Sequence, residues 1–238
     1  MASTAIVLPD GRVLHAHADD DTIGSPGLLW HHGTPQSGAL LPPVLDAARR
    51  NGLRLVSYGR PSYGGSTPRP GRDVASAAAD AAAVLDAFGV DAAVSVGASG
   101  GGPHALACAA LLSGRVTAAL CLAGLAPLDG FDWADRMASS KELRAAQRGR
   151  AARAAVVAVP GMPPGFVDAD LEALATDWAT LGADAGSAGE ASPDGMVDDD
   201  VAFAGPWGVR AARREGPRAA RARRSRRRRP AGPRRAAA

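Results

Sequence analysis

Residues 92–103 read AAVSVGASGGGP, and this stretch decides the fold of the chain. Residues 92–96 have the short, apolar character of a buried strand, and the segment that begins at Pro103 is rich in alanine, which favours a helix. Between them stands Gly97-Ala98-Ser99-Gly100-Gly101, which matches G-x-S-x-G. In this context the pattern predicts a sharp strand-to-helix turn that lifts the Ser99 hydroxyl clear of the sheet.

The turn predicted at Ser99 suits a nucleophile. A tight, strained turn requires small residues on either side of the serine, and Ala98 and Gly100 meet that requirement. The serine hydroxyl would stand at the positive end of the following helix. We therefore interpret Ser99 as a candidate nucleophile.

Two phosphate-binding interpretations of the same glycines fit less well. A dinucleotide fingerprint needs G-x-G-x-x-G, and aligning Gly97 and Gly102 with its outer glycines puts Ser99 at the middle glycine. A phosphate-binding loop needs Gly-Lys before its Ser or Thr, but the only lysine of the chain is Lys141. We expect no cofactor.

The first 128 residues alternate between strand and helix patterns. Asp10-Gly11 between two short apolar runs predicts a hairpin of strands at residues 4–8 and 12–18. Further strands are expected at 28–32, 53–57, 92–96 and 116–123, and helices at 42–50, 73–88 and 103–112. This order predicts an α/β fold with a mostly parallel sheet and helices on both faces.

The pattern changes after Leu128. Residues 129–205 have helical patterns near 141–155 and 170–181, with the Pro/Gly-rich stretches PGMPPG and GADAGSAGEASPDG between and after them. We expect a core at residues 1–128, a helical cap over the site at 129–205 and a disordered Arg-rich tail at 206–238. The alternative for the second part is a pair of surface helices without a gating role.

Large apolar side chains in the cap region are candidates for the lining of a pocket, although packing within the cap itself is an equal alternative. They are Trp133, Met137, Phe166, Trp178 and Phe203.

Two more motifs follow predicted strands. His31-His32-Gly33-Thr34-Pro35 ends the strand at 28–32, on the same sheet edge as Ser99. The N–H groups of Thr34 and Gly100 are therefore candidates to hold an oxyanion together. Residues 58–66, YGRPSYGGS, form a turn-rich loop after the strand at 53–57. No further His, Cys or carboxylate lies at ligand spacing from the histidine pair, so we expect no metal site.

Together, in this order, the three motifs resemble the α/β-hydrolase family, in its serine-nucleophile branch with a helical cap. HG-x-P follows the third strand, R-P-x-x-G-x-S the fourth and G-x-S-x-G the fifth. The resemblance implies that the chain cleaves an ester, amide or similar acyl bond of a small-molecule substrate through an acyl-enzyme. It implies Ser99 as nucleophile and Thr34 and Gly100 as oxyanion donors. The residues that shape the two loops would be His32, Gly33, Gly97 and Gly101.

The remaining members of the catalytic triad are harder to place. The family order is Ser, then acid, then His. Asp129 follows the strand at 116–123 and is a candidate acid, with an ordinary Asp-Gly turn as the alternative. None of the five histidines lies beyond His104, which falls within the helix after Ser99 and is expected to face the helix or the cap. Because we find no triad histidine and no final strands, we expect little or no activity and poor solubility from this chain.

The last thirty residues differ from the rest in charge. Residues 209–238 hold thirteen arginines and one glutamate, whereas the whole chain has a net charge of only +3. Arg, Ala, Pro and Gly, which GC-only codons encode, make up 27 of these residues, so the segment resembles an out-of-frame translation of GC-rich DNA. The alternative is a genuine basic arm that binds nucleic acid or another polyanion without base preference, since it has no aromatic residue.

Composition and hydropathy indicate whether the chain can form a core, span a membrane or carry disulfides. With 46% hydrophobic and 21% charged residues, the chain can bury a sizeable core. No apolar run approaches the ~20 residues of a membrane span, and the N-terminus lacks a secretory signal pattern, so we expect a cytoplasmic protein. Cys108 and Cys121 lie in apolar surroundings and are expected to be small buried side chains.

Overall fold

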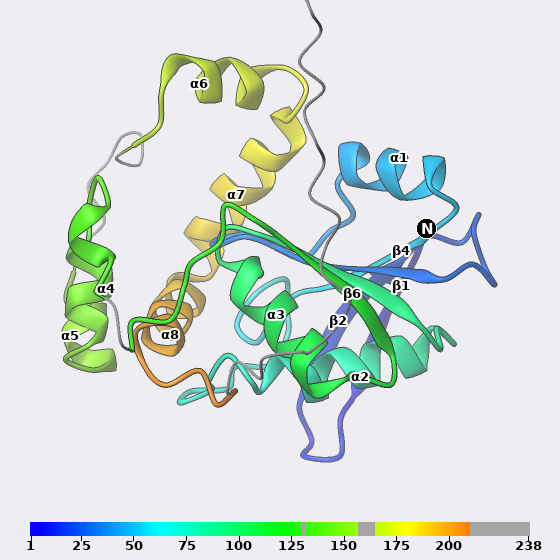
Figure 1. Cartoon of the computed structure of the whole chain (residues 1–238), viewed down its shortest axis with the longest axis horizontal. Coiled ribbons are helices and arrows are strands. Elements are labelled where there is room, and N and C mark those ends of the chain that lie inside the picture. Colours follow the sequence, from blue (N-terminus) through cyan, green and yellow to red (C-terminus); the bar gives the residue numbers. More distant parts are fainter. Residues whose placement is uncertain (130–131, 157–164, 210–238) are drawn as a thin grey trace, which may run out of the picture.

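A six-stranded sheet forms the centre of the computed structural model, which describes residues 1–129, 132–156 and 165–209 (Figure 1). The strand order is β1-β2-β4-β3-β5-β6. Strands β4, β3, β5 and β6 are parallel, while β2 is antiparallel to both β1 and β4. The bounds are β1 Ala2–Val7, β2 Val13–Ala18, β3 Gly27–His31, β4 Arg54–Tyr58, β5 Ala93–Ala98 and β6 Val116–Leu122. The mostly parallel α/β sheet predicted from the sequence is confirmed.

Three helices connect the parallel strands and cover both faces of the sheet. Helix α1 (Pro42–Arg50) lies on one face, and α2 (Ala77–Ala87) and α3 (Gly101–Leu111) lie on the other (Figure 1). Central strands therefore need apolar residues on both faces, and all five residues of β4 are buried. Leu55 packs towards α1, whereas its neighbour Val56 packs towards α2.

Helix α2 begins later than the sequence pattern predicts. The helix was expected to begin at Asp73, but regular helix starts at Ala77. Asp73 still orders the approach to the helix, because its carboxylate accepts the N–H of Ser76 at 2.8 Å. An acidic residue that accepts main-chain N–H groups in this way stabilises the turn before a helix.

All regular elements described after β6 are helices. They are η1 Ala134–Arg136, α4 Lys141–Ala146, α5 Arg150–Ala154, α6 Asp168–Ala175, α7 Ala179–Ala191 and α8 Pro193–Ala204. Residues 182–195, which the sequence pattern assigned to an irregular stretch, lie almost entirely within α7 and α8, so that prediction is wrong. Small residues let α7 approach its neighbours: Gly182 lies against Leu174, and Gly189 lies against Pro35. Tertiary packing thus outweighs the low helix propensity of glycine.

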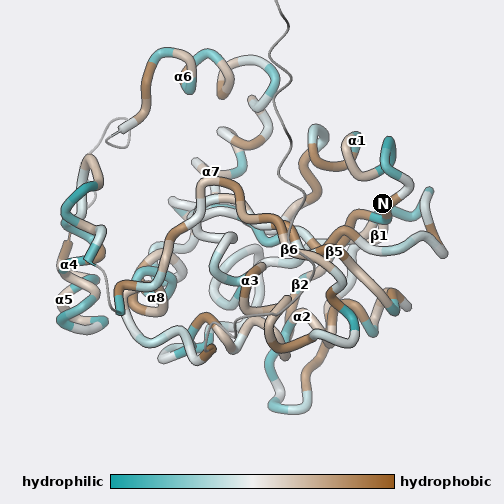
Figure 2. The backbone as a smooth tube through the Cα atoms, viewed as in Figure 1, coloured by the Kyte–Doolittle hydropathy of each residue, from teal (hydrophilic) through white to brown (hydrophobic). Residues whose placement is uncertain are grey.

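The outer edge of the sheet, β6, is open. Only Val116 of this strand is buried, and Leu120 and Leu122 are 49% and 45% exposed. Figure 2 shows much of this strand in the brown of hydrophobic residues. Cys121 is exposed for the same reason, which corrects the expectation of two buried cysteines. Cys108, under α3, is buried as expected, and burial raises the pKa of its thiol to about 12.

None of the helices within the described residues has the length and apolar character needed to cross a membrane.

Candidate active site

Ser99 lies at a sharp turn between β5 and α3, here called the Ser99 turn (residues 97–101). Its φ is +50°, in the left-handed region that non-glycine residues rarely adopt, and the residue is exposed. The main chain holds this conformation from two sides. The Ser99 N–H donates to the Leu122 carbonyl of β6 at 2.9 Å, and the Ser99 carbonyl accepts the N–H of Gly102 at 3.0 Å. The structure therefore forms the turn that the G-x-S-x-G pattern predicts.

The glycines of the Ser99 turn permit close main-chain contacts. A Cβ at Gly97 would overlap the Gly101 carbonyl, and a Cβ at Gly101 would overlap the carbonyl of His31 at the end of β3. A Cβ at Gly100 would overlap the hydroxyl of Thr34. The turn is thus packed directly onto the loop that follows β3, here called the Thr34 loop (residues 32–36).

Two N–H groups near Ser99 are unpaired. The N–H of Thr34 and the N–H of Gly100 donate to no acceptor in the described part of the chain. The N–H of Gly33, by contrast, is bound to the Gln36 side chain at 2.5 Å. The three residues predicted to act together, Ser99, Thr34 and Gly100, are therefore brought to one place by the contact between the two loops.

His32 is a buried structural residue of the Thr34 loop. Its Nδ1–H donates to the Gly33 carbonyl at 2.7 Å, and its Nε2 accepts the main-chain N–H of Arg60 at 3.0 Å. Burial and the nearby Arg60 charge hold the pKa of His32 well below its ordinary value. Because both ring nitrogens are occupied and the ring is neutral, His32 shapes the loop.

A buried polar cluster, which sequence reasoning missed, lies behind the Thr34 loop. Its centre is the Asp199 carboxylate of α8, which is fully buried. Arg60 Nη2 lies 2.7 Å from Asp199 Oδ2, and Arg72 Nη2 lies 2.6 Å from Oδ1. Burial disfavours the charge, but the two guanidinium groups outweigh it and hold the pKa of Asp199 well below its ordinary value. We call Asp199, Arg60, Arg72, Tyr63 and Thr34 the Asp199 cluster.

His104 faces this cluster. Its Nε2 lies 3.7 Å from Asp199 Oδ1, and its ring packs against Phe203 at 5.7 Å between centroids. Burial lowers its pKa to about 4. His104 therefore faces α8, and it makes no hydrogen bond with Ser99 in the described structure.

Asp129, the candidate acid, is exposed in a bend after β6. It makes no hydrogen bond or ion pair with the residues that the structure describes. The same holds for the Ser99 hydroxyl, which no histidine or carboxylate of the described ranges reaches. Within those ranges, the structure brings together the candidate nucleophile and two candidate N–H donors but neither partner of a triad.

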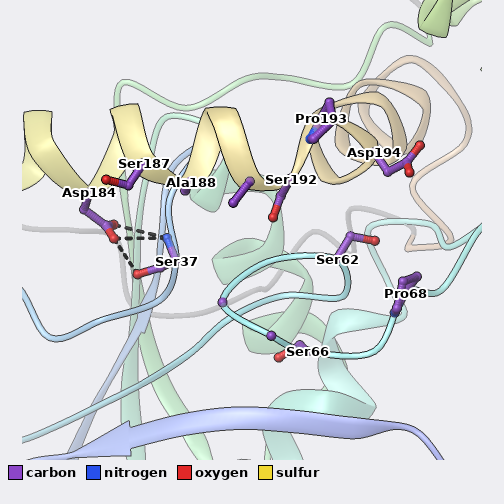
Figure 3. Close-up of a pocket in the computed structure, with 13 residues that line it drawn as sticks. Ser37, Ser62, Ser66, Pro68, Asp184, Ser187, Ala188, Ser192, Pro193 and Asp194 are labelled. Atoms are coloured by element: carbon purple, nitrogen blue, oxygen red, sulfur yellow. Dashed lines mark hydrogen bonds between the residues drawn. The ribbon is translucent and has the colours of Figure 1, made fainter.

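A hollow of about 490 Å³ lies beside the junction of α7 and α8 (Figure 3). Serine hydroxyls and the carboxylate of Asp184 line it, and Asp184 accepts the N–H of Ser37 at 3.1 Å. The lining includes none of Ser99, Thr34 and Gly100. It is therefore separate from the candidate catalytic groups.

None of the five apolar residues proposed for a cap pocket lines this hollow. Trp133 and Phe203 pack in one core cluster with Leu143, and Trp178 packs against the cluster under α1. Met137 and Phe166 are 39% and 46% exposed. For Trp133, Phe203 and Trp178, core packing is thus the observed arrangement. Phe203 additionally lies beside Gly100.

The Arg-rich tail predicted at residues 206–238 lies outside the described residues from position 210 onward. Its hypothesised origin in a shifted reading frame and its hypothesised binding of polyanions stay predictions.

Comparison with known proteins agrees with this geometry. The family model of the alpha/beta hydrolase fold matches residues 26–175. The chain belongs to the α/β-hydrolase family. A search of curated proteins gave no significant match.

Solved structures share the same fold. The enol-lactonase from Burkholderia xenovorans LB400 superposes with a TM-score of 0.60 at 18% identity, covering 87% of this chain and 74% of that chain. The thermophilic esterase from Thermogutta terrifontis gives 0.56 at 20% identity, covering 86% and 72%. An esterase from Rhodococcus sp. ECU1013 gives 0.57 at 22% identity, covering 85% and 73%.

Proposed function

We propose that this chain is a serine hydrolase that cleaves an ester or similar acyl bond of a small-molecule substrate. One observation carries the proposal. Ser99 is held exposed in a left-handed turn, next to the unpaired N–H groups of Thr34 and Gly100. A nucleophile beside two free N–H donors is the arrangement that acyl transfer needs.

The reaction follows from these groups. The Ser99 hydroxyl attacks the carbonyl carbon of the substrate, and negative charge develops on the carbonyl oxygen. The N–H groups of Thr34 and Gly100 stabilise that oxyanion, which then collapses to an acyl-enzyme. The bond between the carbonyl carbon and the leaving oxygen breaks, and that oxygen takes up the proton released by Ser99 and departs as the alcohol. Water releases the acid in a second attack of the same kind and restores the hydroxyl.

None of the five histidines, all within the described residues, is well placed to accept the proton of Ser99. His31, His32 and His104 are buried, and burial lowers their pKa values. His15 and His17 lie on β2, which β3 and β4 separate from β5. Without a general base no group removes the proton of the Ser99 hydroxyl during attack, and loss of a triad member costs on the order of 10⁴–10⁶ in turnover. We therefore infer slow turnover.

We also propose that helices α4 to α8, within residues 129–205, act as a cap over the site. Ion pairs hold the cap helices together, with Arg150 of α5 on Asp198 at 2.8 Å and Arg153 of α5 on Asp200 at 2.6 Å. Helix α8 in turn contacts the core through Asp199 and Phe203. The cap is thus anchored at the end that lies nearest the Thr34 loop.

Chemical rescue tests the proposal. Hydrolysis of a p-nitrophenyl ester is measured with the full chain and with Ser99→Ala, each with and without added imidazole as a substitute base. We expect slow hydrolysis without imidazole and a saturable increase with it, in the unmodified chain alone. Subtracting the Ser99→Ala rate removes the direct reaction of imidazole with the ester.

Equal rates for the two proteins at every imidazole concentration would overturn the proposal. Fast Ser99-dependent hydrolysis without imidazole would support the nucleophile but contradict the inferred lack of a base. Labelling of the unmodified chain, but not Ser99→Ala, by a fluorophosphonate probe gives an independent check that the serine is reactive.

A further inference from the structure

Asp199 belongs to a cap helix, yet its carboxylate contacts the Thr34 loop. Its Oδ2 accepts the Thr34 hydroxyl at 2.5 Å and the Tyr63 hydroxyl at 3.1 Å. The same oxygen lies 2.7 Å from Arg60 Nη2. The contacts of Asp199 with Arg60 and Tyr63 are buried, and the contact with the half-buried Thr34 lies at the edge of this buried group, so water screens these interactions less than it would at the surface.

Arg60 connects Asp199 to the main chain of the Thr34 loop by hydrogen bonds. Its Nη1 donates to the His32 carbonyl at 2.5 Å, and its Nη2 donates to the Gly33 carbonyl at 3.2 Å. The Gly33 carbonyl also accepts Nδ1–H of His32. Two donors therefore hold this carbonyl on the side of the loop that faces the Asp199 cluster.

The position of the Gly33 carbonyl decides where the Thr34 N–H points. In a trans peptide unit the C=O and the N–H point in opposite directions. The Gly33–Thr34 peptide is trans, so holding its C=O towards Arg60 turns its N–H away from the Arg60 guanidinium group. On that side the N–H is unpaired, as the role of an oxyanion donor requires.

Loss of the Asp199 charge would leave the buried cations of the Asp199 cluster without their partner. Two buried guanidinium groups, Arg60 and Arg72, both pair with this one carboxylate. A buried charge that loses its partner is strongly destabilising, so Arg60 would move towards another acceptor or solvent if Asp199 were neutral. The loop carbonyls that Arg60 holds would then be released.

We propose that Asp199 is a positioning residue that, directly through Thr34 and indirectly through Arg60, fixes the direction of the Thr34 N–H. The inference rests on the proposed function, because that N–H matters only if it binds an oxyanion. According to this proposal, the ability of the site to bind an oxyanion depends on how helix α8 packs against the Thr34 loop.

The test compares Asp199→Asn with the matched control Asp198→Asn in the full chain. Asp198 is the next residue of α8 and is also buried, but it pairs with Arg150 of the cap rather than with the Thr34 loop. Thr34→Val is the second test variant. It removes the hydroxyl that donates to Asp199 and accepts Arg60 Nη2 at 3.1 Å, but it keeps the N–H and leaves both arginines paired with Asp199.

Hydrogen exchange is the first measurement, because it needs no catalysis. We expect the main-chain N–H groups of residues 31–37 to exchange about tenfold faster or more in Asp199→Asn and Thr34→Val, but not in Asp198→Asn. Unchanged exchange in both test variants overturns the proposal, whether or not the chain hydrolyses esters. Thr34→Val keeps this measurement decisive if Asp199→Asn does not fold.

Imidazole-supported hydrolysis is the second measurement. We expect kcat to fall about tenfold to a hundredfold in Asp199→Asn with KM unchanged, because the N–H acts on the transition state. An equal fall in Asp198→Asn would indicate a merely structural role and overturn the proposal. If the unmodified chain shows no Ser99-dependent reaction, the proposed function fails, and hydrogen exchange alone decides whether Asp199 orders the loop.

Discussion

Gly101, in the first turn of α3, packs against the main-chain carbonyl of His31 at the end of β3, with no room for a side chain between them. This contact joins the two loops of the candidate site. The Ser99 turn cannot move relative to the Thr34 loop unless the contact opens. The position of the candidate nucleophile relative to the candidate N–H donors is therefore set by main-chain packing.

Gly101→Ala tests that contact. The added Cβ would overlap a backbone oxygen that cannot move aside, so we expect the free energy of unfolding to fall by about 3 kcal/mol. Gly186→Ala is the matched control, since Gly186 lies in α7 with no atom within 4 Å of the added Cβ. There we expect a gain of about 0.5–1 kcal/mol from helix propensity. Urea unfolding measures both, and similar effects of the two substitutions would contradict the packing explanation.

Ser62→Gly should stabilise the protein. Ser62 has a φ of +78°, and its hydroxyl is buried without a hydrogen-bond partner among the described residues. Glycine relieves the left-handed strain, and we expect the unfolding free energy to rise by about 1 kcal/mol, visible as a higher Tm. Ser62→Ala separates the two effects because it removes the hydroxyl but keeps the strain. If alanine stabilises as much as glycine, the backbone strain is not the cause.

His104 should make the fold sensitive to acid. Burial lowers its pKa from 6.5 to about 4, so between these pH values the unfolded chain binds more protons than the folded one. The contribution of His104 to stability is therefore full above pH 6.5 and is lost as the pH drops towards 4. For His104 alone the loss is on the order of 3 kcal/mol. His104→Asn should flatten the curve of unfolding free energy against pH, and an unchanged slope would argue against this assignment. His31 and His32 act in the same direction, so some slope should remain.

Asp200 should change the stability of the fold with pH in the direction opposite to His104. Burial raises its pKa to about 6 despite the pairing with Arg153, and the charges of Asp199 and Glu142 add to the effect. The folded state therefore holds this proton more tightly than the unfolded chain, and the contribution of Asp200 to stability is lost as the pH rises from about 4 to 6. Asp200→Asn should raise the unfolding free energy by about 2 kcal/mol at pH 8 and by little at pH 4. A variant that is less stable at pH 8 would show that the ion pair with Arg153 dominates.

Local patterns in the sequence were enough to predict the sheet and the Ser99 turn. Strand, glycine turn and helix follow each other within residues 92–112, so their interactions are short-range. Asp199 could not be found in this way, because its partner Thr34 lies 165 residues earlier. A weak signal existed: three consecutive aspartates, 198–200, are too many to share one exposed face of a helix, so at least one of them had to point towards the protein.

The predictions that were wrong or undecided share one physical cause. The glycines of residues 182–195 have low helix propensity and masked the helix-favouring alanines between them, and the contacts of Gly182 with Leu174 and of Gly189 with Pro35 show why helix forms. An apolar side chain suits the lining of a pocket as well as a core. Side-chain character alone therefore did not show that Trp133, Phe203 and Trp178 pack in the core. In each case the deciding partner lies in another element of the fold.

The hydrogen bond between Thr34 and Asp199 also has a consequence for biosynthesis. The two residues are 165 positions apart, and the chain is made from the N-terminus at about 5–20 residues per second. The Thr34 loop is thus synthesised on the order of ten seconds before the helix that anchors it. Throughout that interval Arg60 and Arg72 have no Asp199 to neutralise them. The nascent protein must therefore keep two cationic side chains hydrated until α8 emerges, and the site matures as a late event of translation.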